Sequence, residues 1–262
     1  MLDVAVATRN ELGRRSRNED MLCVAHGSGP WLVVLADGAG GHQGGAEAAR
    51  LAVTQLEAAL HQAAPGFDPA TLNQAVLAAH AGVQSGQADA TGLGRMHTTV
   101  VVLWIDPLQR AALWSHVGDS RLYRARRGRL LQLTSDDSVV QRMLDARLIT
   151  PLQAETHPRK NQLIAALGIE DEIDPHTVPQ PVAVEDGDAF LLCSDGWWSV
   201  LDERTILDAL RAAATVDEWL RLMQWHIEQR ALPRQDNFSA IGVWIRDPDE
   251  DTQPRRAAQA QG

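Results

Sequence analysis

The chain has 262 residues, a formal net charge of −10 and a hydrophobic content of 45%, which together describe a globular, acidic protein long enough to bury a substantial core. The negative charge argues against nucleic-acid binding, because phosphates would be repelled. No apolar run approaches the roughly 20 residues of a membrane helix. The two cysteines exclude a disulfide framework, and the first residues do not resemble a secretory signal. We therefore expect a cytoplasmic protein that binds neither nucleic acid nor membrane.

The first part of the chain alternates between a strand pattern and helix patterns. Residues 31–36 are rich in Val and Leu, which is typical of a buried strand. Residues 43–64 carry apolar side chains three and four positions apart, and a Pro-Gly pair ends this predicted helix. Asp68 and Pro69 predict the start of a second helix, because Asp is a favourable N-cap and Pro fits the first helical position. Two helices joined so closely predict an antiparallel pair that packs on a sheet.

Strand patterns separated by tight turns fill the middle of the chain. Such consecutive hairpins imply antiparallel pairing. A helix is predicted over residues 136–148, and Thr150 with Gln153 resembles a capping box that starts another short helix. The predicted strands cover residues 98–105, 110–117, 121–126 and 130–133.

The remainder contains an irregular stretch, further helices and two strands. Residues 157–185 hold four prolines and little periodicity, so we expect a mobile flap there. Hairpins combined with helical pairs favour an α+β fold in which helices cover antiparallel sheets. We expect one catalytic domain over residues 1–246 and a disordered tail over 247–262. Strands are predicted at residues 189–193 and 238–245, and a helix at 202–214. A further helix is predicted from residue 216 onward, with Thr215 and Glu218 as its cap.

Four aspartates stand where predicted strands begin or end, which places their carboxylates at the rim of a sheet. Glycine follows two of them, at Gly38 and Gly196, and lets the chain turn sharply while leaving its own carbonyl available to a metal. Oxygen donors of this kind are preferred by Mg²⁺ and Mn²⁺. A single Asp-Gly pair is a common turn, but four similar settings together favour a divalent-cation site. The four are Asp37, Asp119, Asp195 and Asp236.

The glycine-rich turn after Asp37 also suggests a nucleotide-binding loop. Its spacing does not fit, because the third glycine of the dinucleotide fingerprint would fall at Gln43. The zinc-protease signature H-E-x-x-H and the hydrolase signature G-x-S-x-G are absent as well. Cys193 lies inside an apolar run, so we expect a buried thiol there and not a nucleophile. A phosphate bridged by metal ions is the more economical hypothesis.

Six segments in order give the chain a resemblance to the PPM family of metal-dependent protein phosphatases, bacterial type 2C, over about residues 5–245. The resemblance implies a four-layer αββα sandwich. Two antiparallel β-sheets would be flanked by antiparallel helical pairs, with a metal cleft at one edge. The segments cover residues 13–20, 34–42, 98–105, 115–138, 191–196 and 236–244.

The same resemblance implies a ligand set for two Mn²⁺ or Mg²⁺ ions. Asp37 would bridge both ions, and the carbonyl of Gly38 would bind the second. Asp195 and Asp236 would bind the first ion, while Glu19 would reach the second through a water molecule.

Further roles follow from the resemblance for residues around these ligands. Asp20 and Asn237 would support the ligands, and Asp119 matches the ligand of a weaker third ion. Arg15 matches the arginine that holds the substrate phosphate, since a guanidinium can donate to two phosphate oxygens at once. His42 is a candidate general acid, because imidazole titrates near neutral pH.

The implied activity is hydrolysis of phosphoserine and phosphothreonine in proteins by a water molecule that two metal ions activate. The implied partners are phosphoprotein substrates, among them a serine/threonine kinase and its targets, and the chain is expected to act as a monomer. One alternative is a pseudophosphatase that binds phosphoproteins without turnover, suggested by His97 in place of a family glycine and Ala165 in place of an arginine. A metal-dependent phosphodiesterase is a second alternative, which suits the carboxylates but not the set of motifs.

Overall fold

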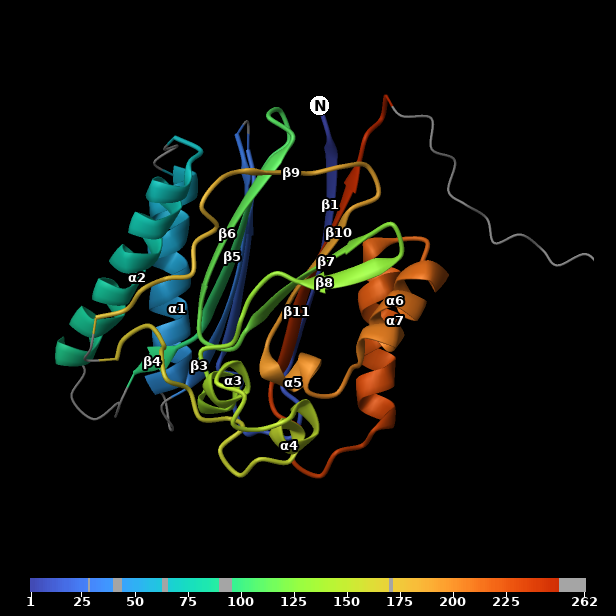
Figure 1. The fold of residues 1–262 in the computed structure, drawn as a ribbon. Helices are drawn as coiled ribbons and strands as arrows, with labels where there is room; N and C mark the ends of the chain where they lie inside the picture. Colours follow the sequence, from blue (N-terminus) through green and yellow to red (C-terminus); the bar gives the residue numbers. More distant parts are fainter. Residues whose placement is uncertain (28, 40–43, 63–65, 90–95, 170–171, 250–262) are drawn as a thin grey trace, which may run out of the picture.

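Two β-sheets lie face to face in the computed structural model of the chain, and a pair of helices covers the outer face of each (Figure 1). The structure describes residues 1–27, 29–39, 44–62, 66–89, 96–169 and 172–249. This arrangement confirms the predicted four-layer α+β sandwich. None of the helices in these ranges is both long and apolar enough to cross a membrane.

Both sheets are antiparallel throughout. The edge strands at residues 3–11, 20–25 and 182–183 were not predicted from the sequence. The first sheet has the order β1 (Asp3–Glu11), β11 (Phe238–Arg246), β10 (Ala189–Cys193), β7 (Arg121–Arg126) and β8 (Arg129–Gln132). The second has the order β2 (Asp20–Ala25), β3 (Trp31–Ala39), β5 (Val100–Asp106), β6 (Ala111–Val117) and β9 (Val182–Ala183), and β4 (His97–Thr98) pairs with β3.

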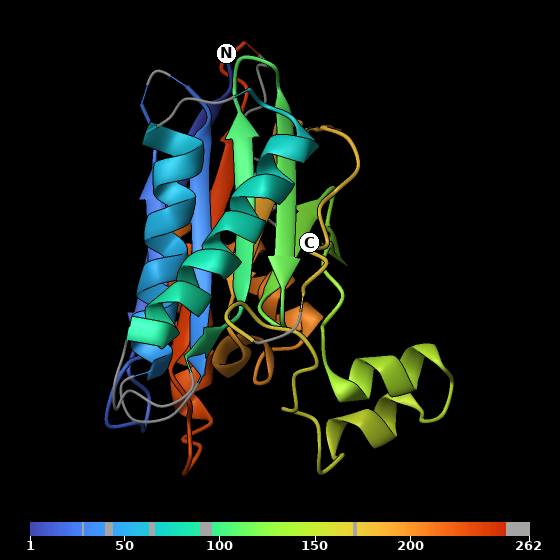
Figure 2. The ribbon, with the colours of Figure 1, turned by 90° about the vertical axis from the view of Figure 1, so that its left-hand side faces the viewer.

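The helices form two pairs and a smaller group. Helix α1 (Gly44–Glu57) continues in a π-helical turn, Ala58–Gln62, and packs with α2 (Pro69–Asp89) over the second sheet. Helices α6 (Glu203–Ala212) and α7 (Val216–Gln229) cover the first sheet. Helices α3 (Val139–Asp145) and α4 (Pro151–Glu155) protrude from the body, as the yellow-green helices of Figure 2 show, and α5 (Asp195–Trp198) is a single turn.

Residues of one strand alternate between two hydrophobic cores, which explains the continuous apolar runs in the sequence. In β3, Val33 and Leu35 face the space between the sheets, whereas Val34 and Ala36 pack under α1 and α2. Because both faces of such a strand are covered, apolar side chains are favoured at successive positions. In β10, Cys193 packs under α6 and α7 and is fully buried, which confirms its predicted place in the core.

The capping signals predicted helix starts better than helix lengths. Asp68 accepts from the backbone N–H of Thr71 at 2.9 Å, and Thr150 forms the predicted capping box with Gln153. The helix predicted from residue 136 begins instead at Val139, because Ser138 caps it by accepting from the N–H of Gln141. The side chains of the two residues before Ser138 form hydrogen bonds with the β6–β7 region.

The first residue of the predicted tail, Asp247, contacts the body of the fold. The carboxylate of Asp247 accepts from Arg110, and its backbone N–H donates to Asp186 at 2.8 Å. Asp247 is 6% exposed. Residues 250–262, which hold the rest of that tail, lie outside the described residues.

Candidate metal centre

Several strand ends meet at one edge of the sandwich and carry acidic side chains. Asp37 lies in β3 directly opposite Asp20 of β2 in the antiparallel register. Asp195 opens α5 immediately after β10, and Asp236 stands two residues before β11. Asp119 lies in the turn between β6 and β7. Five carboxylates therefore come from both sheets to one edge, and we call them the carboxylate centre.

Electrostatic coupling shows how closely these side chains approach one another. Loss of hydration and repulsion by Asp20, Asp195, Asp119 and Asp236, in that order, raise the pKa of Asp37 well above its ordinary value. Desolvation, with a contribution from Asp195, raises the pKa of Asp119 to about 7. These neighbouring carboxyl groups cannot all be ionised at neutral pH unless cations balance their negative charge. The four strand-end aspartates predicted from the sequence do converge in the structure.

One carboxylate oxygen in this centre lacks a hydrogen-bond donor. Asp20 is 7% exposed, and its Oδ2 accepts from Ser194 Oγ at 3.1 Å, whereas its Oδ1 is buried without a hydrogen-bond partner among the described residues. A buried oxygen without a donor is unfavourable. An all-oxygen donor set with an unpaired buried oxygen fits hard divalent cations, whose charge would compensate it.

The backbone around Asp37 is held by two threonines. Thr99 Oγ1 accepts from the N–H of Asp37 at 3.1 Å, and Thr98 Oγ1 donates to the Asp37 carbonyl at 2.9 Å. The hydroxyl of Thr99 also lies 2.7 Å from that of Ser120, next to Asp119. These hydrogen bonds were not predicted from the sequence, although the two threonines lie in one of the segments that resemble the family.

Gly38 is required by close packing. A Cβ at this position would lie 2.1 Å from the carbonyl oxygen of Gly45 in α1 and 2.8 Å from that of Glu19. The N–H of Gly38 donates to the Glu19 carbonyl at 3.1 Å. Because a side chain is excluded here, the loop before β2 and the start of α1 approach the end of β3 directly.

The loop before β2 brings a cation and a further acid to the centre. The Nη2 of Arg15 lies 2.5 Å from Asp236 Oδ2. Asn237 Oδ1 accepts from the N–H of Glu19, while its Nδ2 donates to the carbonyls of Leu12 and Arg17, each bond being 2.9–3.0 Å long. Asn237 thus fixes the loop to the start of β11. Desolvation raises the pKa of Glu19, and Asp236 contributes to the rise.

A cleft of about 670 Å³ opens beside the acids and contains Asp195 and Asp236 in its lining. Lys160 and Arg234 also line it, so cations face this acidic site. Trp198 lines the cleft as well and donates from Nε1 to the carbonyl of Asp119 at 2.9 Å. The neighbouring Trp197 is fully buried in the core.

The arginines of the β7–β8 hairpin are partly structural. Arg121 stacks on Trp198, with its guanidinium carbon 3.6 Å from the ring centroid. The same group donates to both oxygens of Asp136 at 2.8–2.9 Å. Arg121 therefore forms one wall of the cleft.

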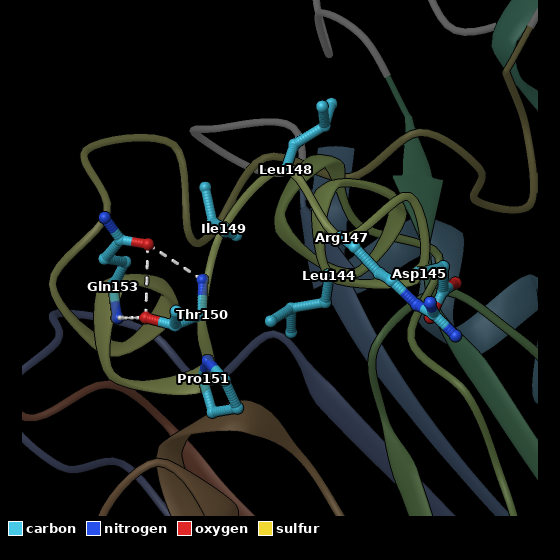
Figure 3. Close-up of a pocket in the computed structure, with 8 residues that line it drawn as sticks. All are labelled: Leu144, Asp145, Arg147, Leu148, Ile149, Thr150, Pro151 and Gln153. Carbon is cyan, nitrogen blue, oxygen red and sulfur yellow. Dashed lines mark hydrogen bonds between the residues drawn. The ribbon is translucent and has the colours of Figure 1, made fainter.

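A second hollow, of about 540 Å³, lies between α3 and α4 (Figure 3). Leu144, Leu148 and Ile149 line it, and the reciprocal hydrogen bonds of Thr150 and Gln153 close one side. A single carboxylate, that of Asp145, is found in its lining. This hollow lacks a set of converging acids and does not resemble a metal site.

The remaining predicted site residue, His42, lies outside the described residues. The two departures noted in the sequence lie at the end of β3 and in the core. His97 pairs with Ala39 at the edge of β3, and Ala165 packs against the core under α1 and α2. Neither substitution removes a group from the carboxylate centre.

Comparison with known proteins adds independent information. A family model described as "Protein phosphatase 2C" matches residues 9–240. The serine/threonine protein phosphatase PstP of Mycobacterium tuberculosis is 32% identical over 259 residues, covering 98% of this chain but 48% of the relative. The chain thus spans about half the length of that relative. Protein phosphatase PhpP of Streptococcus pneumoniae is 34% identical over 200 residues, which cover 74% of this chain and 79% of the relative.

Solved structures agree with these matches. The crystal structure of the M. tuberculosis phosphatase PstP superposes with a TM-score of 0.81 at 30% identity, covering 93% of this chain and 99% of that one. The catalytic domain of PstP in complex with two manganese ions gives a TM-score of 0.78 at 31% identity, covering 94% of this chain and all of that one.

Proposed function

The chain belongs to the protein phosphatase 2C family, and from this premise we propose that it is a metal-dependent phosphatase that hydrolyses phosphoserine and phosphothreonine in proteins. The observation that carries the proposal is the carboxylate centre around Asp37, in which four other acids raise the pKa of Asp37 while Arg15 pairs with Asp236. The relative PstP, whose structure matches this fold, is named as a serine/threonine phosphatase, which supports the substrate class.

We infer that this centre holds two Mn²⁺ or Mg²⁺ ions. Asp37 would contact both, Asp195 and Asp236 would bind one, and the carbonyl of Gly38 the other. Supporting observations are the oxygen donors, the unpaired oxygen of Asp20 and the two manganese ions named for the PstP structure. When bound, such ions supply positive charge and lower the pKa of a coordinated water. Glu19 would contribute through water, and Asp119 would hold a weaker third ion.

Arg15 is the residue we assign to the substrate phosphate. Its side chain is 59% exposed and contacts Asp236 through a single nitrogen, Nη2. A guanidinium carries five N–H donors, so Arg15 can remain on Asp236 while the others face an incoming phosphate. Asn237 keeps the Arg15 loop in position through its contacts with Leu12 and Arg17.

The other parts of the proposal follow the family. His42 is a candidate general acid for the leaving alkoxide. We propose a single catalytic domain over residues 1–246 with a flap at about 157–185, acting as a cytoplasmic monomer on phosphoproteins that include a serine/threonine kinase and its targets. The phosphoprotein-binding alternative receives no support, since its two motivating substitutions lie outside the carboxylate centre.

The proposal is tested by replacing Asp37 with Asn. Loss of the ligand proposed to be shared by both ions should lower Mn²⁺-dependent hydrolysis of a phosphothreonine peptide by about 10³-fold or more. The matched control, Asp208→Asn, changes an exposed aspartate on α6 and should leave the rate within about twofold. Undiminished turnover by Asp37→Asn would overturn the assignment.

A further inference from the structure

Two histidines and one aspartate gather at a place that the carboxylate centre does not include. His116 lies on β6, Asp137 in the loop before α3, and His176 in the extended chain that precedes β9. One possible ligand atom from each lies within 4.8 Å of the others. We call these three residues the His–Asp–His cluster.

Backbone hydrogen bonds hold all three residues in place. The N–H of His176 donates to the carbonyl of His116 at 3.0 Å, so residue 176 runs along β6. The N–H of Asp137 donates to the carbonyl of Gly118 at 2.9 Å, and Asp137 Oδ2 accepts from the N–H of Gly118 at 2.9 Å. The cluster is therefore arranged by the fold itself and not by contacts between its own side chains alone.

His116 has the environment of a metal-binding histidine. It is 3% exposed, and its Nε2 lies 2.8 Å from the carbonyl oxygen of Ser135, to which it can donate. Its Nδ1 is buried and has no hydrogen-bond partner among the described residues. Ligating histidines characteristically donate from one ring nitrogen to a carbonyl or carboxylate and present the lone pair of the other to the ion. Desolvation lowers the pKa of His116, which favours the neutral ring that a metal requires.

His176 and Asp137 supply the other two ligands next to this buried ring, and His176 is the exposed one. Nε2 of His176 lies 2.9 Å from Asp137 Oδ1, and the His176 side chain is 51% exposed. Its ring stacks on that of His116 with centroids 4.8 Å apart. A tetrahedral ion with bonds of about 2.1 Å needs ligand atoms about 3.4 Å apart. Rotation of the exposed His176 ring can bring its nitrogen closer to the other two ligand atoms. The exposure of this ring also gives an ion a path from solvent.

We propose that the His–Asp–His cluster binds a divalent ion of the zinc type through the two imidazoles and the Asp137 carboxylate, with water as the fourth ligand. Two imidazole nitrogens favour Zn²⁺ over Mg²⁺ or Mn²⁺, which prefer oxygen. The site thus differs in chemistry from the carboxylate centre and does not depend on the proposed phosphatase activity. A bound ion would link residue 176 to the turn at Gly118, the residue that directly precedes Asp119.

The experiment is a calorimetric titration of the full chain with Zn²⁺ in saturating Mg²⁺, which occupies the oxygen-rich sites. Wild type is compared with His176→Ala, with the more conservative His176→Gln, and with the matched control His226→Ala. His226 is an exposed histidine on α7, outside the cluster. Thermal unfolding in Mg²⁺ verifies that each variant is folded.

We expect wild type and His226→Ala to bind one more equivalent of Zn²⁺ than His176→Ala does, or to bind it at least about tenfold more tightly. His176→Gln should also lose this binding, because an amide is a poor zinc ligand. Equal stoichiometry and affinity in wild type and both His176 variants would overturn the proposal. So would the absence of Zn²⁺ binding by wild type.

Discussion

Two of the regions in which the protein buries acidic side chains compensate them differently. At the β7–β8 hairpin, Asp188 is 1% exposed and accepts from Arg126 at 2.6 Å through each of its two oxygens. At the carboxylate centre, Asp20 and Asp119 are almost as buried, at 7% and 6% exposed, but repel other acids. The first region carries its cation within the chain. We propose that the second receives its cations from solution, so the two regions should respond oppositely when an acid is neutralised.

The largest effect on stability should come from the paired region. Replacing Asp188 with Asn leaves Arg126 with only part of its compensation, and we expect the free energy of unfolding to fall by about 3 kcal/mol. Urea denaturation measures this change, and the exposed Asp208→Asn is the control. If Asp188→Asn lowers the free energy of unfolding by less than Asp208→Asn does, the two regions do not differ in this way.

The second effect concerns metal binding at the carboxylate centre. A ligand present at about 100 times its dissociation constant stabilises a protein by about 2.7 kcal/mol. For a chain of this length, that corresponds to a rise in Tm of about 5–10 °C. We expect Mn²⁺ to produce such a rise in metal-free wild type and little or none in Asp195→Asn, measured by scanning calorimetry. An equal rise in both proteins would place the bound ion elsewhere.

The smallest effect reverses the sign seen at Asp188. Burial holds the pKa of Asp119 at about 7 in the folded protein, against about 3.9 when unfolded. The folded state therefore binds the proton more tightly, so metal-free stability should decrease as pH rises from about 4 to 7 and remain low above that. At pH 8, Asp119→Asn should stabilise the metal-free protein by about 1–2 kcal/mol. Urea denaturation at pH 6 and 8 tests this, and destabilisation by the variant at pH 8 would contradict it.

The sequence predicted those parts of the fold whose signals are local. Capping residues such as Asp68 and Thr150 identified helix starts, and apolar runs identified strands buried on both faces. The edge strand β1 was missed although Val4 and Val6 alternate with exposed residues, because its polar positions obscure the pattern. The single turn α5 is too short for any period to be visible.

The candidate site also combines residues that local sequence signals predict and residues that they do not. Four aspartates at strand ends could be selected from their positions, and the family resemblance added the finer assignments. The hydroxyls that support them, such as Thr99 and Ser194, come from distant segments and leave no periodic trace. The His–Asp–His cluster joins residues up to 60 positions apart, so only the folded chain reveals it.

We propose that the carboxylate centre holds two divalent ions with Asp37 between them. The decisive measurement is a crystal structure of the wild-type chain grown in Mn²⁺, with anomalous diffraction to locate manganese. We expect two anomalous peaks about 3.5–4 Å apart that share the Asp37 carboxylate, as in other two-metal sites. Full manganese occupancy elsewhere in the molecule with no peak at Asp37 would contradict it.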